Sequence, residues 1–294
     1  MKRCITIFVI QAAAFTPMLS AATAHGGADD GETFYSLDAW ILVPLATISI
    51  LYAIGTYRLN ARDAPRAWRQ HLLFWGGVVL TAVILLGPLH GLGEQSLTFH
   101  MVEHELLMVV AAPLLVLAKP VGTIIWSFPR LGRKIVGGVM VQPLIRKVWD
   151  WATHGTVATV THGLAIWIWH IPFLFNSALA NIAMHRLQHL SFFGTAIIFW
   201  WALIRKSEPG GAAWHLFVTM VHMSLLGALM ALAPRVLYQT EALELAKMGL
   251  TPLMDQQLAG IIMWIPAGLI YAAGTMWALA LWIRSSTERK SGNV

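Results

Sequence analysis

Two apolar stretches of the sequence each contain a pair of histidines four residues apart. They read His-Met-Val-Glu-His over 100–104 and His-Arg-Leu-Gln-His over 185–189. On an α-helix such positions lie on one face, so each pair can offer two imidazoles to one metal ion. Ionisable side chains within membrane-length apolar segments are costly and indicate a functional site. We therefore expect a metal site that contains His100, His104, His185 and His189.

The composition is that of an integral membrane protein. Hydrophobic residues make up 57% of the 294 residues and charged residues only 12%, about half the share that is usual in soluble domains. Apolar segments of about twenty residues, the length that crosses a bilayer core, occur at 38–57, 68–87, 97–118, 153–171, 185–204, 212–233 and 257–283. The sequence thus predicts an all-α bundle of about seven transmembrane helices. Residues 121–148, with two prolines and a basic cluster, are predicted to form an interfacial loop, with or without a re-entrant piece.

Residues 1–24 have the features of a cleavable signal peptide. Lys2 and Arg3 precede an apolar stretch too short to span a membrane, and Ala-Thr-Ala at 22–24 is a small-residue cleavage site. Cleavage would make residues 25–37 an outer segment, in which His25 is either a terminal copper ligand or part of an unstructured end. An uncleaved anchor helix is the alternative. The only cysteine, Cys4, lies within the signal, so the mature chain would offer no thiolate ligand.

Basic residues alternate between the predicted loops. Lysine and arginine follow the first, third, fifth and seventh spans, whereas residues 88–96 and 172–184 contain neither. Because basic loops stay in the cytoplasm, we expect an outer N-terminus, a membrane domain over 38–284 and a cytoplasmic tail over 285–294. In that orientation the outer leaflet holds five histidines: His100, His104, His170, His185 and His189. His90, in the glycine-rich outer loop, and Asp255, just before the seventh span, could approach the same region. The net charge of +6 reflects the same bias, and no nucleic-acid-binding motif occurs.

Copper fits these ligand types best. Imidazole suits copper, zinc and iron, and thioethers at similar depth would suit copper(I); these belong to Met101, Met184, Met223 and Met254. Glu103 and Gln188 either orient the imidazole rings or form a polar lining of the bundle. His162 and His222 lie near the middle of their spans, where they are core histidines or a relay. We expect Glu105 to be structural, because it points away from the histidine face.

The order of motifs along the chain is more specific than any one of them. After 96–104, which reads Ser-Leu-Thr-Phe-His-Met-Val-Glu-His, come Trp-His-Ile-Pro at 169–172, Phe-Trp-Trp at 199–201, His-Met at 222–223, and Asp-Gln-Gln-Leu-Ala-Gly-Ile-Ile-Met-Trp-Ile-Pro at 255–266. From about Trp40 to its end the chain resembles the CtaG family of cytochrome c oxidase assembly proteins, the multi-span group linked to caa-type oxidases. The single-span copper chaperone that shares this name uses cysteine and is a different protein.

The resemblance implies a non-enzymatic role in maturing a haem–copper oxidase. It implies copper delivery to the oxidase catalytic subunit from the periplasmic side of the bacterial inner membrane, with a periplasmic copper donor as a further partner. The positions that match the family motifs are His100, His104, His170, His185, His189, His222, Asp255 and Met263. The five histidines up to His189 also follow from their depth, whereas the last three positions depend on the resemblance.

Three other functions stay open at this point. A membrane desaturase or hydroxylase also uses His-x-x-x-His, although clustered His-x-x-His-His boxes are absent and the cluster is predicted to face outward. The segment 100–104 matches an inverted zinc-protease motif, but a third ligand is not evident downstream. His162 and His222, from two spans, could ligate a b-type haem. The histidine pairs at 100–104 and 185–189 would then have no role.

Overall fold

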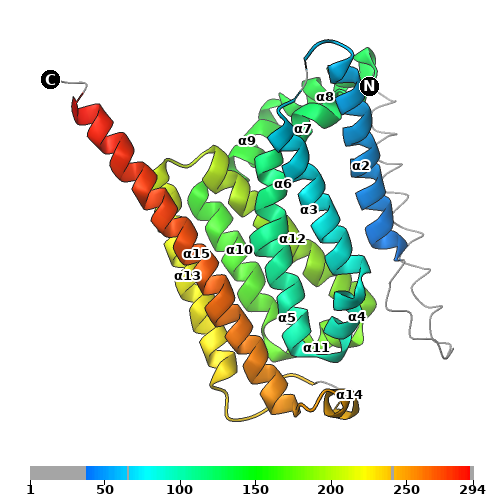
Figure 1. Cartoon of the computed structure of the whole chain (residues 1–294), viewed down its shortest axis with the longest axis vertical. Helices are drawn as coiled ribbons and strands as arrows, with labels where there is room; N and C mark the ends of the chain where they lie inside the picture. Colours follow the sequence, from blue (N-terminus) through cyan, green and yellow to red (C-terminus); the bar gives the residue numbers. More distant parts are fainter. Residues whose placement is uncertain (1–37, 65, 240–241, 292–294) are drawn as a thin grey trace.

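The computed structural model describes residues 38–64, 66–239 and 242–291, and every regular element within these ranges is helical (Figure 1). Six helical segments are long and apolar enough to cross a membrane, and a bent pair of shorter helices can form a seventh span. The prediction of an all-α, multi-span bundle is confirmed. The predicted signal peptide (1–24) and outer segment (25–37), with Cys4 and His25, lie outside the described residues.

The six long spans follow the predicted segments closely. They are α2 (Ala39–Asn60), α3 (Trp68–Leu86), the continuous run of α5 (Leu97–Glu105), a π-helical turn (Leu106–Ala111) and α6 (Ala112–Ala118), then α12 (Ile182–Arg205), α13 (Pro209–Ala231) and α15 (Pro252–Ser291). The last helix is the longest, at 40 residues. It continues through most of the predicted tail, because neither proline nor glycine interrupts residues 275–291.

The fourth predicted span is broken. Helix α10 (Gly155–Trp169) has 15 residues, about 22 Å of helix, and α11 (Pro172–Ala180) follows at an angle of 74°. Pro172 explains the break, because it lacks an N–H and forces the preceding residue out of helical geometry. Ile171 is indeed extended, with ψ 125°. His170 lies at this break and is buried.

The third span is irregular at its centre for a similar reason. The N–H of Ala112 reaches back five residues to the Leu107 carbonyl, and Pro113 has no N–H to offer the Met108 carbonyl. The indole N–H of Trp200 donates to that carbonyl instead, at 2.9 Å. Trp200 thus provides the hydrogen bond that lipid could not give to the Met108 carbonyl. The same bond joins α12 to the third span.

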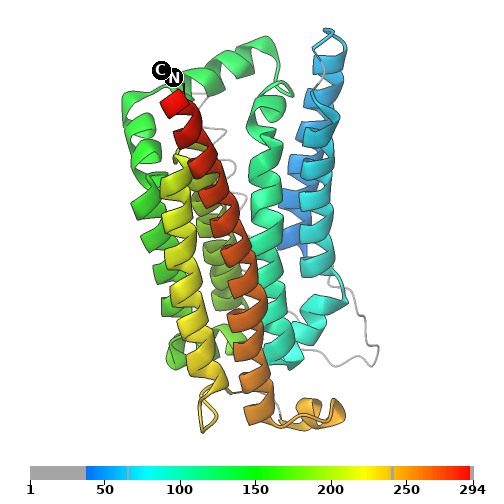
Figure 2. The same ribbon diagram turned by 60° about the vertical axis from the view of Figure 1, so that its left-hand side comes forward.

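The predicted interfacial loop contains three short helices, α7 (Pro120–Ile125), α8 (Arg130–Met140) and α9 (Pro143–Ala152). Helices α8 and α9 bury no side chain and carry separate basic and apolar faces, which is typical of helices at a membrane surface. They lie across one end of the bundle, whereas the short helices α4 (Pro88–Gln95), α11 and α14 (Ala242–Lys247) lie at the other (Figures 1 and 2).

The close packing of α13 on α15 depends on two glycines. A Cβ added at Gly227 would lie 2.7 Å from the Gly260 carbonyl oxygen, and one added at Gly260 would lie 2.6 Å from the Gly227 carbonyl oxygen. Small residues at such positions let two membrane helices approach within backbone contact. These two helices carry Asp255, Met263 and His222 and are therefore held as one unit.

We expect Gly260→Ala to lower the free energy of unfolding by about 1–3 kcal/mol, because the new methyl group overlaps the backbone of α13. Gly194→Ala in α12 is the matched control, since nothing lies within 4 Å of a Cβ there and alanine favours a helix. Thermal unfolding of the detergent-solubilised variants measures both. Equal midpoints for the two variants would show that the α13–α15 contact is not tight.

Candidate metal centre

The side chains of the two histidine pairs meet between α5 and the N-terminal part of α12. The Nε2 atoms of His100 and His104 are 2.8 Å apart, and those of His185 and His189 are 2.7 Å apart. Between the helices, the ring centroids of His104 and His189 are separated by 4.6 Å and those of His100 and His185 by 5.4 Å. The structure therefore brings together all four histidines that the spacing pattern selected.

These distances suit a shared cation. Two imidazole nitrogens on one tetrahedral ion with bonds of about 2.0 Å stand about 3.3 Å apart, so small ring rotations would open each pair enough. His100 is 0% and His104 is 2% exposed, which excludes bulk water from this half of the cluster. The Nδ1 atoms of His100, His104 and His189 have no hydrogen-bond partner among the described residues. Buried polar groups without partners are uncommon unless a ligand or water completes them.

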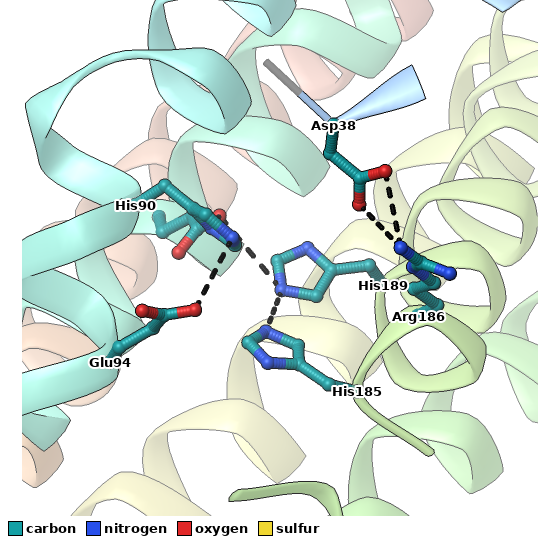
Figure 3. A network of polar contacts seen from close by, with 7 residues as sticks. Asp38, His90, Glu94, His185, Arg186 and His189 are labelled. Atoms are coloured by element: carbon teal, nitrogen blue, oxygen red, sulfur yellow. Dashed lines mark hydrogen bonds and ion pairs between the residues drawn. The ribbon is translucent and has the colours of Figure 1, made fainter. Parts of the chain in front are cut away.

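His90 and Glu103 complete the cluster. His90, from α4, lies 2.8 Å from Glu103 through its Nδ1 atom, and the same Glu103 oxygen is 3.8 Å from His189 Nε2. Candidate ligand atoms of His90, His185 and His189 all lie within 4.8 Å of one another (Figure 3). The sequence indicated that His90, in the glycine-rich outer loop, could approach this region, but the predicted ligand set did not include it. The structure places it within the cluster.

The carboxylate of Glu103 is the negative charge of the cluster. It is fully buried, and its Oε2 atom has no hydrogen-bond partner among the described residues. Burial disfavours the charged form of His90, but the hydrogen bond with Glu103 and its negative charge outweigh burial and raise the pKa of His90 above its usual value. Five imidazoles and one carboxylate thus offer nitrogen and oxygen ligand atoms of the kind that borderline metal ions prefer.

Arg186, within the second motif, forms its ion pair with a carboxylate other than Glu103. Its guanidinium forms an ion pair at 2.9 Å with Asp38, the residue that caps α2, and it lies 5.6 Å from the centre of the Trp40 ring. Figure 3 shows this pair beside the histidines. The pairing neutralises the arginine and fastens the start of α2 to α12.

Asp255 organises the site from α15. Its Oδ1 atom accepts hydrogen bonds from the Ser96 and Thr98 hydroxyls at 2.6 and 2.7 Å, and its Oδ2 atom accepts one from the Leu97 N–H at 2.7 Å. A carboxylate at this position caps the first turn of α5 and favours its dipole. The family resemblance placed Asp255 among the metal residues; its hydrogen bonds go to the start of α5 rather than to the histidines.

The other three predicted residues lie further out. His170 contacts Phe175 and Phe192, whose rings also touch His100 and His104, so it stands one aromatic layer away. The imidazole of His222 lies next to Gly163 of α10, and Met263 is buried against Gly227. Among the described residues, no hydrogen bond or ring contact joins His222 or Met263 to the four histidines.

The comparisons with known proteins agree with the motif order. Residues 50–285, which are most of the chain, match the family model described as cytochrome c oxidase caa3 assembly factor. Neither the comparison with curated proteins nor the comparison with solved structures found a match. The family model is described by a role in cytochrome c oxidase assembly, and its matched range contains both histidine pairs.

We expect Asp255→Asn to lower the free energy of unfolding by about 2–4 kcal/mol, because an amide replaces an acceptor that faces buried donors. Asp63→Asn is the control, since Asp63 is exposed with φ 52° and asparagine tolerates that region; its effect should stay within about 0.5 kcal/mol. Thermal unfolding in detergent measures both. Wild-type stability in Asp255→Asn would show that α5 does not depend on this cap.

Proposed function

The chain belongs to the cytochrome c oxidase caa3 assembly factor family, and we propose that it serves oxidase assembly by binding copper and delivering it to the catalytic subunit. The observation that carries this proposal is the convergence of His100, His104, His185 and His189 beside the Glu103 carboxylate. Imidazole binds copper strongly, and copper(II) stands highest among the divalent first-row metals in affinity for nitrogen ligands. A haem–copper oxidase needs this ion.

The cluster has a graded exposure that suits transfer. The side chains of His90 and His189 are 15% and 13% exposed, whereas Glu103 is 0% exposed and the imidazoles of α5 are buried. An incoming ligand can reach the exposed imidazoles first, so the ion can exchange its ligands one at a time. A closed site with four equivalent buried ligands would release the ion more slowly.

The orientation of the cluster follows from charge. Arginine and lysine gather at the end of the bundle that carries α7, α8 and α9, and basic segments remain in the cytoplasm. The histidine cluster, at the opposite end, would then face the periplasm of a bacterial inner membrane. From there it could receive copper from a periplasmic donor and pass it to an oxidase in the same bilayer.

We expect the detergent-solubilised protein to bind at least about one copper(I) per chain in competition with a chromophoric chelator. His185→Ala with His189→Ala should weaken binding at least about tenfold, because it removes two of the five converging imidazoles. His154→Ala with His215→Ala is the matched control at the other end of the bundle and should bind as the wild type does. A wild-type chain that binds no copper would contradict the proposal.

Metal analysis of the purified protein distinguishes the copper carrier from the three alternative functions. Zinc held by the same histidines, with peptide hydrolysis lost in Glu103→Gln, would favour the zinc-protease alternative. A Soret band lost on substitution of His162 or His222 would favour the b-type cytochrome. Iron with oxygen-dependent hydroxylation of a lipid would favour the desaturase or hydroxylase class. Copper without these activities would support the carrier.

We expect a strain that lacks this protein to assemble an oxidase deficient in copper, and His100→Ala with His104→Ala to fail to restore it. The measurement is the copper content and activity of the purified oxidase, with equal membrane levels of each variant verified. Full restoration by the histidine variant would show that the protein assists assembly as a scaffold and does not deliver copper.

A further inference from the structure

The end of the bundle away from the histidine cluster holds a pocket lined by four arginines. It has a volume of about 430 Å³ and lies between the last turns of α2 and the start of α8. The side chains that define it are Tyr57, Arg58, Arg62, Phe128, Arg130 and Arg133. Nothing in the proposed copper function uses this pocket.

Two of these arginines are held against one aromatic ring. The guanidinium carbon of Arg133 lies 4.1 Å from the centre of the Trp126 ring, and that of Arg62 lies 5.1 Å from it. Stacking on an aromatic ring fixes the plane of a guanidinium and leaves its N–H groups free to donate. The positions of Arg62 and Arg133 are thus set before any ligand arrives.

A third arginine joins the two walls of the pocket. Arg58 donates from Nη1 to the Ser127 carbonyl at 2.7 Å, which ties α2 to the segment between α7 and α8. Gly55, one turn earlier, packs against the backbone of Thr123 in α7 so closely that a Cβ would overlap it. The pocket is therefore built on a rigid contact between α2 and α7.

The positive charge of this pocket is uncompensated within the described part of the chain. No carboxylate there lies within 4.0 Å of the guanidinium groups of the four arginines. Helix α8 also begins here after Pro129, which offers no side-chain acceptor to the first N–H groups of the helix. Four arginines beside a helix N-terminus favour the binding of an anion.

The surroundings of the pocket are apolar and face outward. Tyr57 is 76% and Leu131 is 70% exposed, and Ile54 on α2 and Ile135 on α8 are also exposed. A soluble anion would gain nothing from these side chains, whereas the acyl chains of a lipid would cover them. Basic pockets between membrane helices recognise anionic headgroups in this way.

We propose that this pocket binds the phosphodiester headgroup of an anionic glycerophospholipid. Arg62 and Arg133 donate to the phosphate oxygens in the forked geometry that guanidinium offers, Arg130 adds charge at the start of α8, and Arg58 holds the walls together. The acyl chains lie along the exposed apolar side chains of α2 and α8. The bound lipid would fasten α8 to the bundle and neutralise the pocket.

Native mass spectrometry of the full chain in detergent tests this, with dioctanoyl phosphatidylglycerol as the probe. We expect one phosphatidylglycerol to bind at least about tenfold more tightly than dioctanoyl phosphatidylcholine, because the zwitterionic lipid brings its own cation. Arg62→Gln with Arg133→Gln should weaken phosphatidylglycerol binding at least about tenfold. Arg146→Gln with Lys147→Gln removes the same charge from α9, where Arg146 already faces Asp150, and should leave binding unchanged.

Three results would overturn the proposal: equal affinity for the two lipids, unchanged binding in Arg62→Gln with Arg133→Gln, or an equal loss in the α9 control. Competition with inorganic phosphate is a further test. If phosphate displaces phosphatidylglycerol at a concentration similar to that of the lipid, the pocket is a site for free anions and the assignment to lipid is wrong. If the double variant does not fold, Arg130→Gln, an exposed position, should still weaken lipid binding about threefold, and unchanged binding there would also overturn the proposal.

Discussion

The hydrogen bonds between Asp255 and the first turn of α5 position the rest of the candidate site. A helix that begins inside a membrane bundle exposes N–H groups that no water can satisfy. Asp255 accepts from the Ser96 hydroxyl, the Leu97 N–H and both donors of Thr98, and it comes from a helix that starts more than 150 positions later in the chain. The rotation of α5, and with it the direction of His100 and His104, depends on this one carboxylate.

Proline determines the irregular geometry around that helix. Pro113 leaves a carbonyl of the third span for Trp200 of α12, so the two helices that carry the histidine pairs are joined below the cluster as well as at it. Pro172 ends α10 and turns the chain by 74°, which brings Phe175 against His100. The phenyl ring closes the cluster on the side of His170. The helix break therefore places an aromatic ring against the histidine cluster, where a straight span would continue away from it.

Much of this arrangement could be predicted from the sequence, and the limits have physical causes. Hydropathy defined five spans within three residues because the bilayer length is encoded locally, whereas the last helix extends beyond its predicted segment at both ends. The spacing of four selected the paired histidines because that spacing is a property of one helix. The role of Asp255 and the inclusion of His90 depend on contacts between distant segments, which no local pattern carries. Pro172 is compatible with the observed bend, but a proline at the end of an apolar segment is equally compatible with an uninterrupted span that ends there.

The two ends of the bundle use opposite electrostatics. At one end, histidines surround the buried Glu103 carboxylate, and the nearby Arg186 is paired with Asp38. At the other end, guanidinium groups stack on Trp126 without a carboxylate partner in the described chain. The two groups lie at opposite ends of the bundle (Figure 1), and this distance weakens the interaction between their charges. Among the described residues, Glu103 has no arginine partner, so its carboxylate stays available to the histidines around it.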